Sequence, residues 1–380
     1  MIEAMEMPRD SLPDPGDGAP VQPVPRPAPD RALAALRPTL APLVALRWLP
    51  MPLLALAALM GGWWMVPALA ATLLAVFVQE TPDAPVDDAG GGPDLAIALA
   101  LGSAGLLPLL LFALTGGAAL GFWGWLGLLV AASLWFGQLG AAAGHALIHM
   151  PGREGDLGAA YFCLFWAGPF VSAHRLVHHP AAATPDDPFT ADEGEGFWGY
   201  AARAWPAGFV AGWEMEAAIA RTAPGGRAPV LHPYVFYAAV SLAVTLALSL
   251  IAGAGGMILH LILSALVQMQ LLLADYLRHH GRLRRRDGLG EVAPFGPAHE
   301  WVAPDPFAVL RGNHPRPGDH LLHDGAAPGP VTGAAPRLPA SFPVMAFCAL
   351  VPPLFARMMA RRRAAPLAAR RPARGATPGG

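Results

Sequence analysis

The chain has 380 residues, of which 54% are hydrophobic and only 14% are charged, with a formal net charge of −2. An ordinary soluble domain carries roughly 25% charged residues. This composition therefore excludes a typical water-soluble protein and predicts an integral membrane protein. We expect no nucleic-acid partner.

The chain divides by composition into three parts. Residues 1–38 are rich in Pro, Ala and Asp without apolar periodicity, which indicates a disordered cytoplasmic tail, and their acidic start does not fit a signal peptide. We expect a membrane domain over 39–355 and a basic tail over 356–380.

Three stretches contain no Asp, Glu, Lys or Arg: 48–79, 95–152 and 228–274. A helix needs about 20 apolar residues to cross the hydrocarbon core of a bilayer. Each stretch can hold two spans joined by a turn at glycines, namely at 61–62, 116–117 and 253–256. The sequence predicts an all-α integral membrane fold of about six transmembrane helices with a cytoplasmic histidine-rich cap.

Arginines follow the predicted sixth span, over 278–286, and the last apolar segment, over 357–374. The positive-inside rule places both clusters in the cytoplasm. An even number of spans then places the N-terminus there too. We expect a multi-pass protein of the inner (cytoplasmic) membrane with both termini cytoplasmic, in contact with membrane lipids.

Histidines gather at the cytoplasmic ends of the predicted spans. His145 and His149, in Gly-His-Ala-Leu-Ile-His-Met, are four residues apart and share a helix face. This pair alone also fits two interfacial helix-end histidines. His174, His178 and His179 follow an apolar segment, 161–171, that is too short to cross and is expected to dip into the membrane or lie along it. Five histidines within 35 residues on one side favour a metal site over a solvated loop.

Two more groups follow. His279 and His280 end the predicted sixth span, whereas His260 lies 19 residues earlier, about 28 Å away along a continuous helix. We expect His260 to hydrogen-bond between helices, and His232 to have a structural or supporting role. Residues 313–323 hold the last group, with prolines that disfavour a helix: His314, His320 and His323.

Imidazole ligands limit which metals and which reactions fit this site. Imidazole suits Fe, Zn, Cu and Ni. A zinc protease needs a glutamate directly after the first histidine of its motif, but Ala146 stands there. Hydrolysis is therefore disfavoured, and neutral histidines spread over several helix ends favour an oxygen-activating iron centre.

The pattern resembles the integral-membrane alkane hydroxylases (alkane 1-monooxygenases), relatives of the membrane fatty-acid desaturases. That family carries HExxH-, EHxxxHH-, NYxEHYG- and RHSDHH-type boxes, which are similar to the histidine groups above. The resemblance covers about residues 40–360, and three further segments look like the family: 183–198, 296–301 and 341–355.

The resemblance implies two non-haem irons, O2 as co-substrate and hydroxylation of the terminal carbon of an alkyl chain lying in a pocket among the spans. It implies electrons from rubredoxin or a ferredoxin, which would be a separate chain because no CxxC pair occurs in this sequence. Carried over, the metal ligands are His145, His149, His174, His178, His179, His279 and His320.

The sequence also departs from the family. Ala146, Ala173 and Arg278 stand where the boxes carry glutamates, which would orient the ligands from behind. In the final box, Pro317 and Leu321 stand where two ligands belong. The possible substitutes are His323, His314, His299 and His280.

Two alternatives stay open. One is a desaturase or hydroxylase of fatty-acyl or lipid-linked chains with the same fold, because the boxes do not fix the substrate. The other is a catalytically degenerate membrane paralogue with an incomplete iron site.

Overall fold

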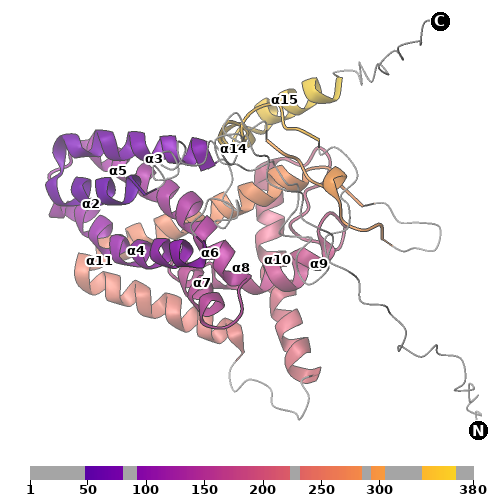
Figure 1. Ribbon diagram of the computed structural model, residues 1–380, viewed down its shortest axis with the longest axis horizontal. Coiled ribbons are helices and arrows are strands. Elements are labelled where there is room, and N and C mark those ends of the chain that lie inside the picture. Colours follow the sequence, from indigo (N-terminus) through magenta and orange to yellow (C-terminus); the bar gives the residue numbers. More distant parts are fainter. Residues whose placement is uncertain (1–47, 80–91, 223–231, 285–291, 304–335, 365–380) are drawn as a thin grey trace, which may run out of the picture.

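The computed structural model describes residues 48–79, 92–222, 232–284, 292–303 and 336–364. These residues form helices joined by turns, with one isolated bridge between Val302 and Arg337. The all-α class is thus confirmed for the described part of the chain (Figure 1). The predicted tail 1–38 lies outside it, and the predicted basic tail begins within α15 (Pro352–Ala364).

The first predicted turn is present as a tight hairpin. Helix α2 (Pro50–Met60) ends at Gly61, and a short helix η1 (Gly62–Trp64) leads into α3 (Met65–Gln79). Gly61 has φ 61°, and a Cβ there would lie 3.1 Å from the carbonyl oxygen of Ala119. Glycine is needed at this position for both its conformation and its lack of a side chain.

The second apolar stretch also folds back on itself. Helix α4 (Gly92–Phe112) continues into the π-helical turn η3 (Ala113–Gly117), where Gly116 has φ 108° and reverses the chain. Helix α5 (Gly121–Leu134) then runs through a second π-helical turn, η4 (Trp135–Gly140), into α6 (Ala141–Ile148).

The turn η4 is held by polar contacts inside the bundle. The Tyr161 hydroxyl donates to the carbonyl of Phe136 at 2.6 Å, and the Gln138 amide donates to Gln270 at 3.0 Å. A π-turn inserts one residue into the helical register. It therefore sets the direction in which the histidines at the end of α6 point.

The third stretch is the long helix α11 (Pro233–His279), which is broken at Gly253 (φ 64°, ψ −167°). Its two halves are antiparallel, because the Thr245 hydroxyl lies 3.2 Å from Nδ1 of His260. Fifteen residues along a continuous helix would separate them by about 22 Å. The predicted turn near 253–256 is confirmed. His260 bonds between helices as expected, since its Nε2 lies 2.7 Å from the carbonyl oxygen of Leu164.

By length and composition, three of the described helices can cross a membrane: Ala96–Gly117, Gly121–Ile148 and Pro233–His279. The third is folded at Gly253, and two shorter apolar helices form the first hairpin. The described residues thus hold six apolar helical segments, packed around one large buried cluster that includes Leu110, Trp135 and Phe165.

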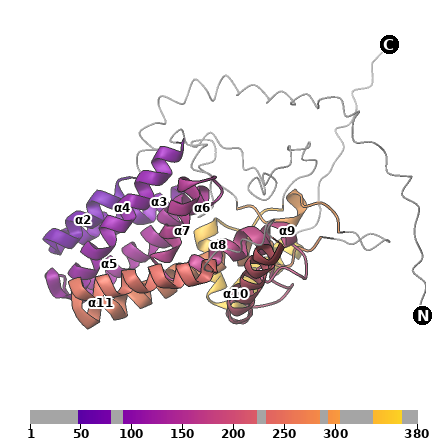
Figure 2. The same cartoon turned by 90° about the horizontal axis from the view of Figure 1, so that it is seen from below.

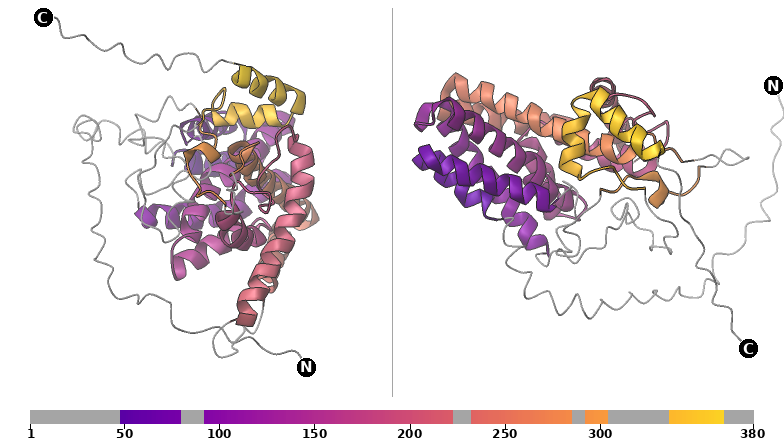
Figure 3. Two further views of the ribbon diagram at one scale, coloured as in Figure 1. Left: turned by 90° about the vertical axis from the view of Figure 1, so that its right-hand side faces the viewer. Right: turned by 90° about the horizontal axis from the view of Figure 1, so that it is seen from above.

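The remaining helices gather at the end of this bundle where α6 and the second half of α11 finish (Figures 2 and 3). Helix α7 (Arg153–Cys163) and α8 (Gly168–Ala173) replace the predicted apolar segment 161–171 by two short helices. Helix α10 (Phe197–Thr222), α14 (Phe342–Ala349) and α15 pack around the end of α11 through a second buried cluster.

Candidate metal centre

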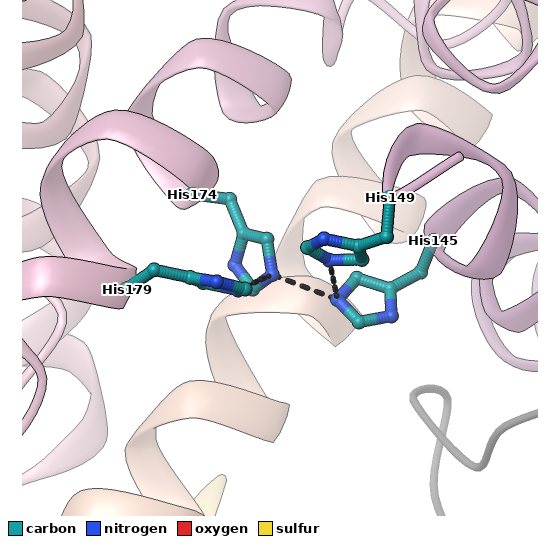
Figure 4. Close-up of side chains that lie close together, drawn as sticks. All are labelled: His145, His149, His174 and His179. Carbon is teal, nitrogen blue, oxygen red and sulfur yellow. Dashed lines mark hydrogen bonds between the residues drawn. The ribbon is translucent and has the colours of Figure 1, made fainter. Parts of the chain in front are cut away.

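Four histidines from three segments converge on one point (Figure 4). His145 and His149 end α6, His174 begins the π-helical turn η5 (His174–His178), and His179 begins α9 (His179–Ala181). The Nε2 atom of His174 lies 2.7 Å from that of His145 and 2.9 Å from that of His179. The Nε2 atoms of His145 and His149 are 3.4 Å apart. All four possible ligand atoms lie within 4.8 Å of one another.

The buried surroundings of this cluster favour metal binding. His145, His174 and His179 are buried, and His149 is partly so. Burial, followed by the neighbouring histidines, holds the pKa of His174 well below its ordinary value. Its imidazole is therefore neutral at physiological pH, which is the form that binds metal ions. A set of four imidazoles fits iron, zinc, copper or nickel.

The π-helical turn explains how His174 and His179 meet. In an α-helix, residues five positions apart point about 140° away from each other. A π-turn instead closes residue i onto i+5, which brings both rings to one side. The ring of His178 is then directed elsewhere, toward Asp187 and His279.

His178 is held by a buried carboxylate. Its Nδ1 lies 2.9 Å from Oδ2 of Asp187, and Asp187 also accepts bonds from the backbone N–H of Phe189 at 3.0 Å and the hydroxyl of Thr190 at 2.7 Å. Burial would lower the pKa of His178, but the charge and hydrogen bond of Asp187 outweigh it and raise the pKa to about 9. The pair fixes the ring with Nδ1 toward Asp187, and a metal ion bound at Nε2 would replace the proton there.

His279 completes a second candidate position. Its ring centroid lies 5.1 Å from that of His178. Its Nδ1 donates to the backbone carbonyl of His299 at 3.2 Å, which leaves the lone pair on Nε2. That Nε2 atom is buried and makes no hydrogen bond within the described part of the chain. A metal ion would satisfy it, so these residues fit two ligands of a second ion.

The other predicted candidates lie elsewhere. The ring of His280 packs against Tyr276 and Phe355, at 5.0 and 5.1 Å between centroids. Nδ1 of His299 accepts the N–H of Gly296, and its backbone carbonyl accepts from Nδ1 of His279. Neither joins the four-histidine cluster. His314, His320 and His323 fall in 304–335, outside the described residues.

Arg278, which replaces a glutamate of the third histidine box, lies opposite the carboxylate of Glu300. Nε of Arg278 lies 3.6 Å from Oε1 of Glu300, and both side chains are buried. The backbone N–H of Trp301 donates to the carbonyl of Arg278 at 2.8 Å and holds the 296–303 loop against α11. The positive charge beside His279 is thus balanced by a loop carboxylate.

The identification of the ligands from sequence missed two supporting carboxylates, Asp187 and Glu300. Asp187 had a local signal, since it comes eight residues after His179 within an Asp-Asp-Pro sequence. Glu300 carried none, because its contact with Arg278 depends on how the loop folds back onto α11.

Beside the histidines lies an apolar cavity of about 550 Å³ between α8, α10 and both halves of α11. Phe170 and Phe189 line it, and their rings lie 4.9 and 5.9 Å from those of His174 and His178. The cavity therefore ends one side chain away from the cluster. Asp275, whose charge acts on His178, is the charged residue in the described wall.

The fold is thus a bundle of apolar helices with histidines at one end that could hold a metal ion, and with an apolar cavity beside them. The family model for fatty acid desaturases matches residues 120–323, more than half of the chain. The chain belongs to the fatty acid desaturase family.

Within that family the chain is similar to alkane 1-monooxygenases. It is 28% identical over 247 residues to alkane 1-monooxygenase 2 of Pseudomonas aeruginosa, covering 62% of this chain and 65% of that protein. It is 30% identical over 203 residues to alkane 1-monooxygenase 1 of Alcanivorax borkumensis (50% and 48%) and 28% over 206 residues to alkane 1-monooxygenase of Ectopseudomonas oleovorans (50% and 49%). The matches thus span less than two thirds of these relatives, and the predicted resemblance is confirmed.

Proposed function

We propose that this protein is a membrane-bound non-haem diiron monooxygenase that hydroxylates the terminal carbon of alkanes or alkyl chains. It would use O2 and electrons from a separate rubredoxin or ferredoxin. The observation that carries the proposal is the apolar cavity that ends one side chain away from the converging histidines. Its relatives are named alkane 1-monooxygenases.

A different set of histidines would hold each of the two irons. His145, His149, His174 and His179 would hold the first. His178 and His279 would hold the second, with His320 from the final box. When bound, the irons supply the activation of O2. The chain supplies the neutral imidazole of His174, the orientation of His178 by Asp187, and a buried site from which bulk water is excluded.

The cavity wall favours a hydrocarbon over a chain whose polar head must be bound inside. Several of its hydroxyl, amide and indole groups already bond within the protein: Trp166 to Thr245, Tyr237 to Ser172, Tyr234 to Phe209, and Trp205 to Gln268. A buried polar group of a ligand would find few partners there, and leaving it unpaired is costly. This supports alkanes over acyl lipids as substrates.

The apolar helical segments support a membrane domain of six spans. In this proposal α2, α3, α4, the α5–α6 helix and the two halves of α11 each cross or enter the inner membrane. The metal centre and both termini would lie on the cytoplasmic side, as the arginine clusters indicate.

The test is iron analysis of purified protein, followed by incubation with octane, O2 and a reductant-driven ferredoxin or rubredoxin. We expect bound iron and 1-octanol as the product, detected by gas chromatography. Protein with less than one tightly bound iron per chain and no product would refute the function and favour the degenerate paralogue. Unsaturated product from acyl lipids, with none from octane, would favour the desaturase.

A further inference from the structure

The cavity has a mouth at the outer surface of the helices. Several of its lining residues are exposed: Trp205, Phe209, Trp213, Val235 and Ala238. Four of these five side chains are large and apolar. Such a rim is unfavourable in contact with water, but it is the ordinary surface of a protein in contact with lipid tails.

The surface around the mouth has the same character. On α11, which is long and apolar enough to span a membrane, both halves expose large hydrophobic side chains: Leu242 and Leu246 on the first half, Leu261 and Ile262 on the second. The mouth therefore faces the side of the bundle that hydrocarbon would cover.

One hydrogen bond crosses this mouth. Nε1 of Trp205 on α10 donates to Oε1 of Gln268 on the second half of α11 at 2.7 Å. The amide nitrogen of Gln268 is in turn fixed by the carbonyl of Phe165 at 2.9 Å. Both side chains line the cavity, so the bond joins two of its walls at the surface.

We propose that hydrocarbon enters the cavity sideways from the bilayer, and that the Trp205–Gln268 pair is a latch that decides which hydrocarbon shapes pass. Hydrogen bonds between helices in a bilayer are modest in strength, so the latch opens and closes thermally. While it is closed, the indole narrows the mouth. Slim unbranched chains pass more readily than branched or cyclic ones.

The entry route can be tested by chemical labelling of a cysteine, which does not require the protein to be catalytically active. In full-length protein in lipid nanodiscs, the native thiols are removed by Cys163→Ala and Cys348→Ala, and Leu272→Cys places a reporter in the cavity wall. Leu272 lines the cavity and is partly buried. N-dodecylmaleimide dissolved in the bilayer should label it at least tenfold faster than a charged thiosulfonate in the water. Equal or faster labelling by the charged reagent overturns sideways entry.

The latch is tested in the same background. Gln268→Leu, which keeps the volume but removes the acceptor, and Trp205→Phe, which removes the donor, should each speed dodecylmaleimide labelling at least threefold. The matched control is Trp198→Phe. Trp198 is an exposed tryptophan of the same helix whose indole bonds to the carbonyl of Leu350, away from the cavity. Unchanged rates in both latch variants, or the same acceleration in the control, overturn the latch.

Two further reporters keep the result interpretable. Ala238→Cys, at the mouth, should label quickly in every variant and normalises for reagent in the membrane, and Leu271→Cys replaces Leu272→Cys if that variant does not fold. The inference rests on the proposed function only for substrate selection. There, Gln268→Leu should raise kcat/KM for branched octanes relative to octane at least threefold, whereas Trp198→Phe, away from the cavity, should leave that ratio unchanged. Labelling as expected in a protein without activity would refute the function and retain the entry route.

Discussion

The Nε2 atoms of His145 and His174 lie 2.7 Å apart although 29 residues separate them in the chain. One comes from the end of a helix that is long and apolar enough to span a membrane and the other from a π-turn in the cap. Two ring nitrogens at this distance share a proton, or they approach the same ion. Their convergence with His149 and His179 favours the ion.

His174→Ala tests that interpretation. His174 is the histidine whose Nε2 contacts both neighbouring helices, so its loss should release the ion of the four-histidine cluster, roughly one per chain. Elemental analysis of purified protein measures this. His232→Gln is the control, because His232 stacks on Trp213 at 3.8 Å and caps α11. Equal metal content in His174→Ala and wild type would contradict the site.

Asp187→Asn should weaken metal binding about 10- to 100-fold, since it removes the charge that orients His178 while keeping the shape. Titration of metal-free protein with Fe(II) under anaerobic conditions measures the affinity. The control is Asp186→Asn, an exposed carboxylate one residue earlier. If both variants bind iron like wild type, Asp187 does not support the site.

The same pair predicts a pH dependence of the metal-free protein. The folded-state pKa of His178 is about 9, above its ordinary value of 6.5. A raised pKa stabilises the fold fully below about pH 6.5, and that contribution is lost as the pH rises through 9. The unfolding temperature of wild type should therefore exceed that of Asp187→Asn most at pH 6, and the gap should shrink toward pH 10. A constant gap would exclude the ion pair.

Glu300→Gln should destabilise the protein by about 1–3 kcal/mol, because it removes the negative charge that lies 3.6 Å from the buried Arg278 guanidinium. The double variant Arg278→Met, Glu300→Leu should recover most of this loss, since apolar residues can replace a buried pair. Chemical unfolding in detergent micelles measures both. Equal destabilisation by the single and double variants would show that the pair is not the cause.

Gly253→Ala should cost about 1–3 kcal/mol, since its φ of 64° with ψ of −167° is open almost only to glycine. No atom lies within 4 Å of the added methyl group, so the cost comes from the backbone alone. Gly255→Ala is the control, with an ordinary conformation and 3.4 Å of space to Thr115. Thermal unfolding compares them, and equal losses would argue against a conformational role for Gly253.

Much of the fold could be predicted from charge-free stretches and their glycines. Gly61, Gly116 and Gly253 all have positive φ and reverse the chain where the sequence predicted turns. The reason is physical: a polar loop inside a bilayer is unfavourable, and a sharp reversal between apolar helices selects glycine. The predicted number of six spans is not established in the same way. Helix length and composition identify three helices that can cross a membrane, and spans by the shorter helices are proposals.

The histidine groups could also be recognised in the sequence, but their division into two candidate metal positions could not. Spacing fixes angles only on a regular α-helix, and the π-turns at 135–140 and 174–178 leave no periodic signal. The roles of Asp187 and Glu300 and the cavity depend on contacts between distant segments. The final box, with His320, lies outside the described residues, so its part in the site stays a prediction.

The π-turn has a consequence for transplanting this site. His174, His178 and His179 belong to one short piece of backbone, and its shape sends their rings in two directions. The backbone of this single turn thus sets the separation of the two candidate metal positions. Placing the sequence HxxxHH on a regular α-helix would reproduce the ligands but not their separation. A designer would have to transfer the backbone of 174–179 together with its side chains.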